Sequence, residues 1–193
     1  MSTWVVHHQD ALWPGLLAVG ATARIAELLW ARRLAACARG RGVRPAAEPI
    51  FGAMVVLHTL PFWLAPLEVW GLGRPFVPAV FVACVAALAG LFALRLWTLW
   101  SLGSSWNVRL VAPERVVVRG PYRWVRHPNY AIVVAELALL PLAHLAWASA
   151  ALIAALNAVV LGVRIPAEER LLGRVPGYAE AMRGKARFIP GVL

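Results

Sequence analysis

Charged side chains are scarce in this sequence, and acidic ones are the scarcest. Asp, Glu, Lys and Arg together make up 15% of the 193 residues, whereas 61% are hydrophobic and ten are tryptophan. A soluble domain of this size usually carries about 25% charged residues. The shortage excludes a water-soluble domain, and the long apolar runs predict an all-α integral membrane protein.

Cysteine is also rare, and no repeat or linker divides the chain. The two cysteines, Cys37 and Cys84, lie far apart, which excludes a disulfide framework and a zinc motif, so we predict no metal site. The first ten residues lack the basic region of a cleaved signal, so the first apolar run is expected to remain in the protein. Residues 1–193 are therefore predicted to form a single membrane-embedded domain.

Four apolar regions, 11–31, 50–71, 76–102 and 130–163, predict the membrane spans. One helix through the whole last region would rise about 50 Å, whereas a hydrocarbon core is about 30 Å thick. Pro141, His144 and Trp147 lie near the middle of this region. We therefore favour a helical hairpin over a single helix kinked at Pro141. The hairpin gives five transmembrane helices, of which residues 1–101 hold the first three.

Basic residues outnumber acidic ones by 19 to 9, and their placement indicates an orientation. All but three of them lie in three segments, which follow the first, third and fifth predicted spans. With five spans these segments share one side of the membrane, which the positive-inside rule makes cytoplasmic. Basic loops beside spans serve topology and attract anionic lipids, so we expect membrane lipids as partners and no nucleic acid.

Several ionisable residues fall within the predicted spans. Arg24 and Glu27 are three residues apart and are expected to pair with each other. Arg95 is expected either to reach the membrane surface with its long side chain or to line a substrate tunnel. His58 is expected to be a core residue with satisfied hydrogen bonds rather than a ligand-binding residue.

The C-terminal segment is predicted to be amphipathic. Apolar or small residues recur at helical spacing between Leu171 and Met182, which indicates a helix along the membrane surface. Pro176 and Gly177 interrupt the pattern, so we expect two short helices that meet there.

The densest polar cluster is "RGPYRWVRHPNY", residues 119–130. Pro128 suits the first turn of the helix that follows, so His127 and Asn129 would flank a helix start, where free N–H groups favour an anion. Arg123 and Arg126 add positive charge to the same place. The pattern predicts an anion-receiving pocket at the mouth of the hairpin. The alternative is that the arginines only set topology and His127 caps the helix.

Two adjacent carboxylates, Glu168 and Glu169, stand at the other end of the hairpin. Such a pair is often a solvated face, but the hairpin would bring it close to residues 126–130. Carboxylates commonly hold ribose hydroxyls, whereas arginine or a helix start binds a ligand's carboxylate. Cations, aromatic rings and carboxylates together suit a zwitterionic cofactor that carries a sugar.

These segments resemble a known family. "GPYRWVRHPNY", a hydrophobic hairpin, "EE" and the closing "GYAEAMRGKARFIPGV" resemble the isoprenylcysteine carboxyl methyltransferase family, over roughly residues 102–193. The family pattern Arg-His-Pro-x-Tyr-x-Gly, followed by Glu-Glu, is matched at Arg126, His127, Pro128, Tyr130, Glu168 and Glu169. This sequence departs from the pattern at Ile132, which occupies the position of the glycine.

The resemblance implies a membrane enzyme that transfers a methyl group from S-adenosyl-L-methionine to a lipophilic or prenylated acceptor. Residues 102–193 would be its cofactor-binding catalytic region. The resemblance implies cofactor binding by His127, Tyr130 and Glu169, with support from Arg126 and Glu168. Weaker assignments are Tyr122, Asn107, Tyr178 and Arg187.

Two acceptor classes remain open. "RHPNYAIVVAELALLPL" resembles a bacterial subgroup that includes O-methyltransferases of alkylpyrones and alkylresorcinols, which implies a bacterial cytoplasmic membrane. An isoprenylcysteine-type carboxylate is already ionised, whereas a phenol with a pKa near 10 benefits from a general base. Glu136 and Glu169 are the candidate bases, with Arg126 as a further catalytic residue.

Glu136 would lie roughly 10 Å into the membrane, where a carboxylate is costly and marks a candidate functional site. The alternative is a structural pair with Asn157 or His144. Two other functions also remain open: an NADPH-dependent reductase of the sterol-reductase type, and a non-enzymatic membrane scaffold.

Overall fold

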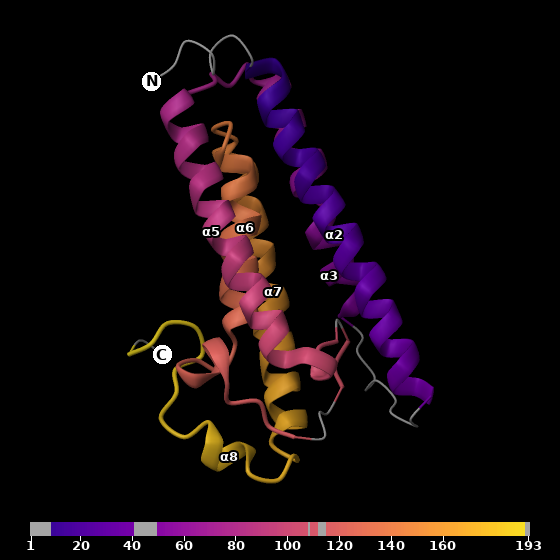
Figure 1. The fold of residues 1–193 in the computed structure, drawn as a ribbon. Coiled ribbons are helices and arrows are strands. Elements are labelled where there is room, and N and C mark those ends of the chain that lie inside the picture. The colour runs from indigo at the N-terminus through magenta and orange to yellow at the C-terminus, as the bar shows by residue number, and fades with distance from the viewer. Residues whose placement is uncertain (1–8, 41–49, 108, 112–114, 192–193) are drawn as a thin grey trace.

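The protein is a bundle of helices in the computed structural model, which describes residues 9–40, 50–107, 109–111 and 115–191 (Figure 1). The α-helices in chain order are α2 (Gln9–Gly40), α3 (Phe51–Thr59), α4 (Pro61–Gly71), α5 (Pro78–Leu102), α6 (Pro128–Leu142), α7 (Trp147–Leu172) and α8 (Tyr178–Ala181). Two 3₁₀ turns, η1 (Gly103–Ser105) and η2 (Gly120–Arg123), lie between α5 and α6. These ranges contain no strand, so the all-α prediction is confirmed for them.

Four stretches within the described ranges are long and apolar enough to cross a membrane: Asp10–Cys37, Phe51–Gly71, Pro78–Ser105 and Trp147–Leu172. Helix α6, the predicted fourth of five spans, has 15 residues and rises about 22 Å, which is less than a core of about 30 Å. The chain is thus a multi-pass membrane protein, but the count of five spans is not confirmed. The predictions for residues 1–8 and 41–49 fall outside the described ranges.

Region 130–163 forms the predicted hairpin. Helix α6 ends at Leu142, α7 begins at Trp147, and Leu145 in the turn has a φ of 55°. The alternative of one continuous helix kinked at Pro141 is therefore wrong. The hairpin brings the start of α6 and the end of α7 to the same end of the bundle, as Figure 1 shows.

Helix α4 fastens the turn of this hairpin. The Glu68 carboxylate accepts the backbone N–H groups of Ala148 at 3.2 Å and Ser149 at 2.6 Å. These are among the first N–H groups of α7, which have no partner inside the helix. Arg74 balances the charge of Glu68 at 2.7 Å.

The loop before α6 is held from two sides. Gly120 has a φ of 58°, and a Cβ there would lie 2.0 Å from the Ser101 Oγ atom, so the loop packs directly on the end of α5. From the C-terminal tail, the Ala186 carbonyl accepts the Arg126 N–H at 2.9 Å and the Arg187 carbonyl accepts the His127 N–H at 2.8 Å. The residues before α6 therefore have a fixed backbone.

The predicted pair of amphipathic C-terminal helices is not confirmed. Helix α7 continues to Leu172, and the part of the tail that the structure describes contains one further helical turn, α8. The break at Gly177 is present, with a φ of 79°. Val175, Tyr178 and Met182 are buried together, so the apolar side chains of this segment pack on the protein.

Candidate functional site

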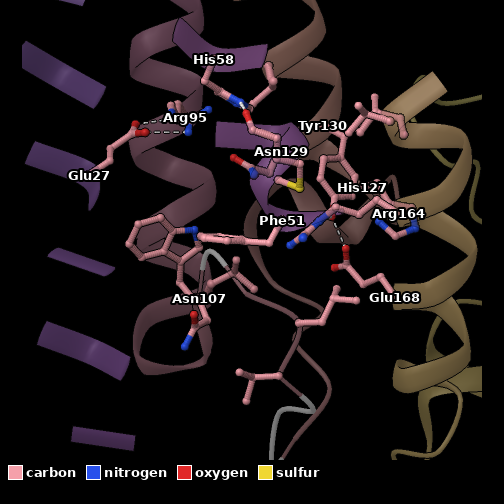
Figure 2. Close-up of a pocket in the computed structure, with 18 of the residues that line it drawn as sticks. Glu27, Phe51, His58, Arg95, Asn107, His127, Asn129, Tyr130, Arg164 and Glu168 are labelled. Atoms are coloured by element: carbon pink, nitrogen blue, oxygen red, sulfur yellow. Dashed lines mark hydrogen bonds and ion pairs between the residues drawn. The ribbon is translucent and has the colours of Figure 1, made fainter. Parts of the chain in front are cut away.

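One large cavity lies between the helices at the end of the bundle where the loop and the tail meet. Its volume is about 410 Å³, within the range of ligand pockets, and residues of every helix from α2 to α8 line it. Figure 2 shows His58, Arg95 and Glu27 towards its upper left and His127, Arg164 and Glu168 towards its right. Asn129 lies between these two groups.

Seven of the ten predicted site residues line this cavity. They are Asn107, Tyr122, Arg126, His127, Tyr130, Glu168 and Tyr178. The hairpin and the tail bring them together from four separate segments of the chain. The other three, Glu136, Glu169 and Arg187, do not line it.

Tyr130 stands between a carboxylate and a cation. Its hydroxyl donates to Glu168 and accepts from Arg164 Nε at 2.6 Å. A hydroxyl has one proton to donate, so these two bonds fix its direction. The contact orients Glu168 at the cavity wall.

Glu169 does not line the cavity but contacts residues that do. It accepts from Arg187 through two bonds, Nε to Oε1 at 3.1 Å and Nη2 to Oε2 at 2.8 Å. Its Oε1 also lies 3.2 Å from His127 Nε2 and 3.3 Å from Arg126 Nη1. We call these four residues the Glu169 clamp. A carboxylate only accepts, so the Nε2 atom of His127 carries the proton of this bond.

The clamp also explains one electrostatic feature outside the membrane spans. The hydrogen bonds of Arg187 with Glu169 raise the pKa of Arg187 above its ordinary value. The Glu169 carboxylate therefore stabilises the charged form of Arg187.

Burial keeps two tyrosines of the site neutral. It raises the pKa of Tyr122, and the Glu168 charge adds to the effect. It likewise raises the pKa of Tyr178, to which Glu169 contributes. Both phenols therefore keep their proton and are available as hydrogen-bond donors.

Three polar atoms of the cavity residues are buried without a hydrogen-bond partner among the described residues. They are Asn129 Oδ1, Arg126 Nε and Tyr178 Oη. Buried polar groups in folded proteins are nearly always paired. Three such atoms around one cavity indicate that a polar ligand completes the site.

Glu136 belongs to a separate group of charges. Arg24 Nη2 donates to its Oε2 atom at 2.6 Å, and Arg95 Nη1 approaches the same atom at 3.2 Å. Both arginines also bind Glu27, at 3.0 Å from Arg24 and 2.8 Å from Arg95. These four residues of α2, α5 and α6 form what we call the ion network, in which two positive charges balance two negative ones.

The ion network settles several sequence predictions. The Arg24–Glu27 pair is confirmed, and Arg95 lines the cavity. The predicted structural partners of Glu136, Asn157 and His144, are wrong, because its partners are the two arginines. Glu136 lines a small neighbouring hollow, and its role as a base stays a prediction that this position does not support.

Arg164 is a site residue that the sequence analysis does not single out. It lies four residues before Glu168 on the same helical face. That spacing was available in the sequence as a sign that both reach the same wall.

Comparison with known proteins identifies the family to which the chain belongs. The pattern of the isoprenylcysteine carboxyl methyltransferase (ICMT) family matches residues 81–174, from within α5 to just past α7. The chain belongs to this family. It is also 33% identical over 159 residues to the uncharacterised protein YpbQ of Bacillus subtilis (strain 168), an alignment that covers 81% of this chain and 94% of YpbQ. Family membership indicates a membrane methyltransferase, and the matched region contains the hairpin with His127, Tyr130 and both glutamates.

The Glu169 clamp predicts how firmly the tail is held. Glu169→Gln removes the charge that binds Arg187, and the tail should then open more often. We expect trypsin to cleave after Lys185 and Arg187 roughly tenfold faster in detergent, because a charged hydrogen bond contributes about 1.5–3 kcal/mol. The rate is measured by mass spectrometry of the released peptides.

The matched control is Glu180→Gln, which changes an exposed glutamate of α8. It should leave the cleavage rate unchanged. Equal rates for wild type and Glu169→Gln would show that the clamp does not hold the tail.

Proposed function

We propose that this protein is an S-adenosyl-L-methionine-dependent O-methyltransferase whose acceptor is a lipophilic molecule within the membrane. The observation that carries the proposal is the single cavity that combines buried, unsatisfied polar atoms at the loop end with apolar walls between the helices. Membership of the ICMT family supports methyl transfer.

The residues present fit this cofactor. Arg126 offers a cation with an unsatisfied Nε to an amino-acid carboxylate, and Glu168 offers carboxylate oxygens to ribose hydroxyls. Tyr178 and Asn129 offer further hydrogen-bonding atoms. His127 and Tyr130 are held in place by Glu169 and by Arg164, so they present fixed surfaces to the cofactor. Glu169 acts as a positioning residue in this arrangement.

Methyl transfer requires little from the protein beyond alignment of the two reactants. When bound, the cofactor supplies a methyl group that its sulfonium already makes electrophilic. The side chains of the cavity bring the acceptor into line and exclude water, which are large contributions to catalysis. No metal is needed for such a transfer.

The acceptor would enter between the helices from the lipid. Apolar side chains of α2, α3 and α6 line that part of the cavity, among them Leu28, Met54 and Val133. Both an isoprenylcysteine-type carboxylate and a phenolic or pyrone lipid have an apolar chain that suits these walls. The arginines of the ion network are already balanced by glutamates, which favours an uncharged head group over a carboxylate.

The reductase and scaffold alternatives are less well supported, because the family is one of methyltransferases. Cofactor binding separates all three. Adenosylhomocysteine should raise the melting temperature of the purified protein in detergent, whereas NADPH should not. Protection by NADPH alone would favour a reductase, and protection by neither would favour a scaffold.

Glu168 provides the sharpest test of the cofactor site. Glu168→Gln should weaken adenosylhomocysteine binding roughly tenfold or more, because a carboxylate accepts hydrogen bonds about twice as strongly as a neutral group. Isothermal titration calorimetry measures the affinity, with Glu180→Gln as the matched control. An affinity equal to that of wild type would remove Glu168 from the site.

We further propose that the cavity opens towards the cytoplasm of a bacterial cell, as the positive-inside rule requires of its basic loop and tail. Cys37, exposed near the C-terminal end of α2, reports this side, whereas Cys84 is buried. A membrane-impermeant maleimide should label Cys37 in inverted vesicles and not in intact spheroplasts. Labelling in intact spheroplasts would reverse the orientation, and Cys37→Ser shows the background.

A further inference from the structure

His58 has a fixed tautomer and an unused nitrogen at the wall of the cavity. Its Nδ1 lies 2.7 Å from the Met54 carbonyl oxygen, which only accepts hydrogen bonds, so Nδ1 carries the proton. In the neutral ring, Nε2 then has a free lone pair. No other residue in the described part of the chain forms a hydrogen bond with Nε2.

The His58 side chain lies between the helices. It follows Phe51 by seven residues on α3, a rise of about 10 Å from the start of the helix. On α5, Arg95 lies seven residues before Leu102, the last residue of that helix. His58 lines both the large cavity and the small hollow beside it.

The ion network lies beside His58. Arg24, Glu27 and Arg95 line the large cavity with His58, and Glu136 lines the small hollow with it. The arginines of the network are paired with its glutamates. Because Nδ1 carries the proton of the neutral ring, Nε2 is the atom that can accept a further proton.

The glutamates of the site are already bound by other residues. Glu168 already accepts from Tyr130, and Glu169 is bound by Arg187, Arg126 and His127. Glu136 is held by two arginines.

We propose that His58 is the general base of the methyl transfer, acting on the hydroxyl of the phenolic or pyrone lipid that the proposed function already allows as an acceptor. The inference rests on the proposed function and deepens it. A hydroxyl delivers a proton that a base must take, whereas a carboxylate acceptor has none to give at neutral pH.

In the proposed step, the O–H bond of the acceptor breaks and its proton goes to Nε2 of His58, which becomes an imidazolium. The oxygen's electron pair forms the new bond to the methyl carbon, and the electrons of the broken carbon–sulfur bond stay on sulfur. The imidazolium then returns its proton to water when the product leaves.

This role lies outside the region that the family pattern matches. The match covers residues 81–174, whereas His58, Arg24 and Glu27 all precede it. The base thus comes from the N-terminal helices of this chain, and the cofactor residues come from the matched C-terminal part.

The test compares wild type with His58→Gln, which keeps a polar side chain of similar size without a basic nitrogen. Methyl transfer from S-adenosyl-L-methionine to 5-pentadecylresorcinol is measured in detergent micelles from about pH 6 to about pH 10. His144→Gln, at the turn of the hairpin, is the matched histidine control.

We expect His58→Gln to lower kcat by roughly 100-fold or more near neutral pH, in line with the usual contribution of a general base. The KM and the adenosylhomocysteine affinity should change little. The remaining rate should rise with pH as the free phenol ionises, and His144→Gln should behave like wild type. A kcat within about threefold of wild type, or an equal loss at every pH, would overturn the role of His58.

A second measurement does not depend on activity. The ¹⁵N spectrum of histidine-labelled protein should contain an Nδ1-protonated ring that disappears in His58→Gln. An Nε2-protonated ring for His58 would contradict the inference.

The outcomes distinguish this inference from the proposed function. A protein that binds no adenosylhomocysteine fails as a methyltransferase of this kind. A protein that binds it and methylates a prenylcysteine analogue, but not the resorcinol, remains a methyltransferase and refutes the hydroxyl acceptor.

Discussion

The bond between His127 and Glu169 is the contact on which the site depends. The two residues are 42 positions apart, one before α6 and one near the end of α7, and the hairpin between them makes the contact possible. Arg187 adds the tail to the same carboxylate, and the tail in turn holds the backbone before α6. Three segments of the chain thus acquire fixed positions around one cavity, as the proposed cofactor binding would require.

The ion network determines the polarity and the charge of the other end of the cavity. Four charges inside a membrane bundle are costly, and removal of one would leave another unpaired, so they hold α2 against α5 and α6. Because they balance, they add no net charge to the cavity wall. The protein therefore presents a polar but neutral surface to whatever enters from the lipid, and His58 lies beside it.

The sequence predicted those features that depend on local pattern. The length of region 130–163 and the position of Pro141 predicted the hairpin, and the hairpin placed His127 near Glu169. The shortness of α6 was not predicted, because three of the four turn residues, Ala143, Leu145 and Ala146, are apolar and extend the hydrophobic run. The partners of Glu136 lie 112 and 41 residues away on other helices, a pairing that no spacing along one helix reveals. Arg164, in contrast, could have been assigned to the site from the sequence, because it lies four residues before Glu168 on the same helix.

The central claim is that His127, Tyr130 and Glu168 form one wall of the cofactor site. An experimental structure of the protein with adenosylhomocysteine tests it most directly. The account predicts ligand density in the large cavity, in contact with those three side chains and with Arg126. Density at any other place, or a cavity filled by side chains when the ligand is bound, would contradict it.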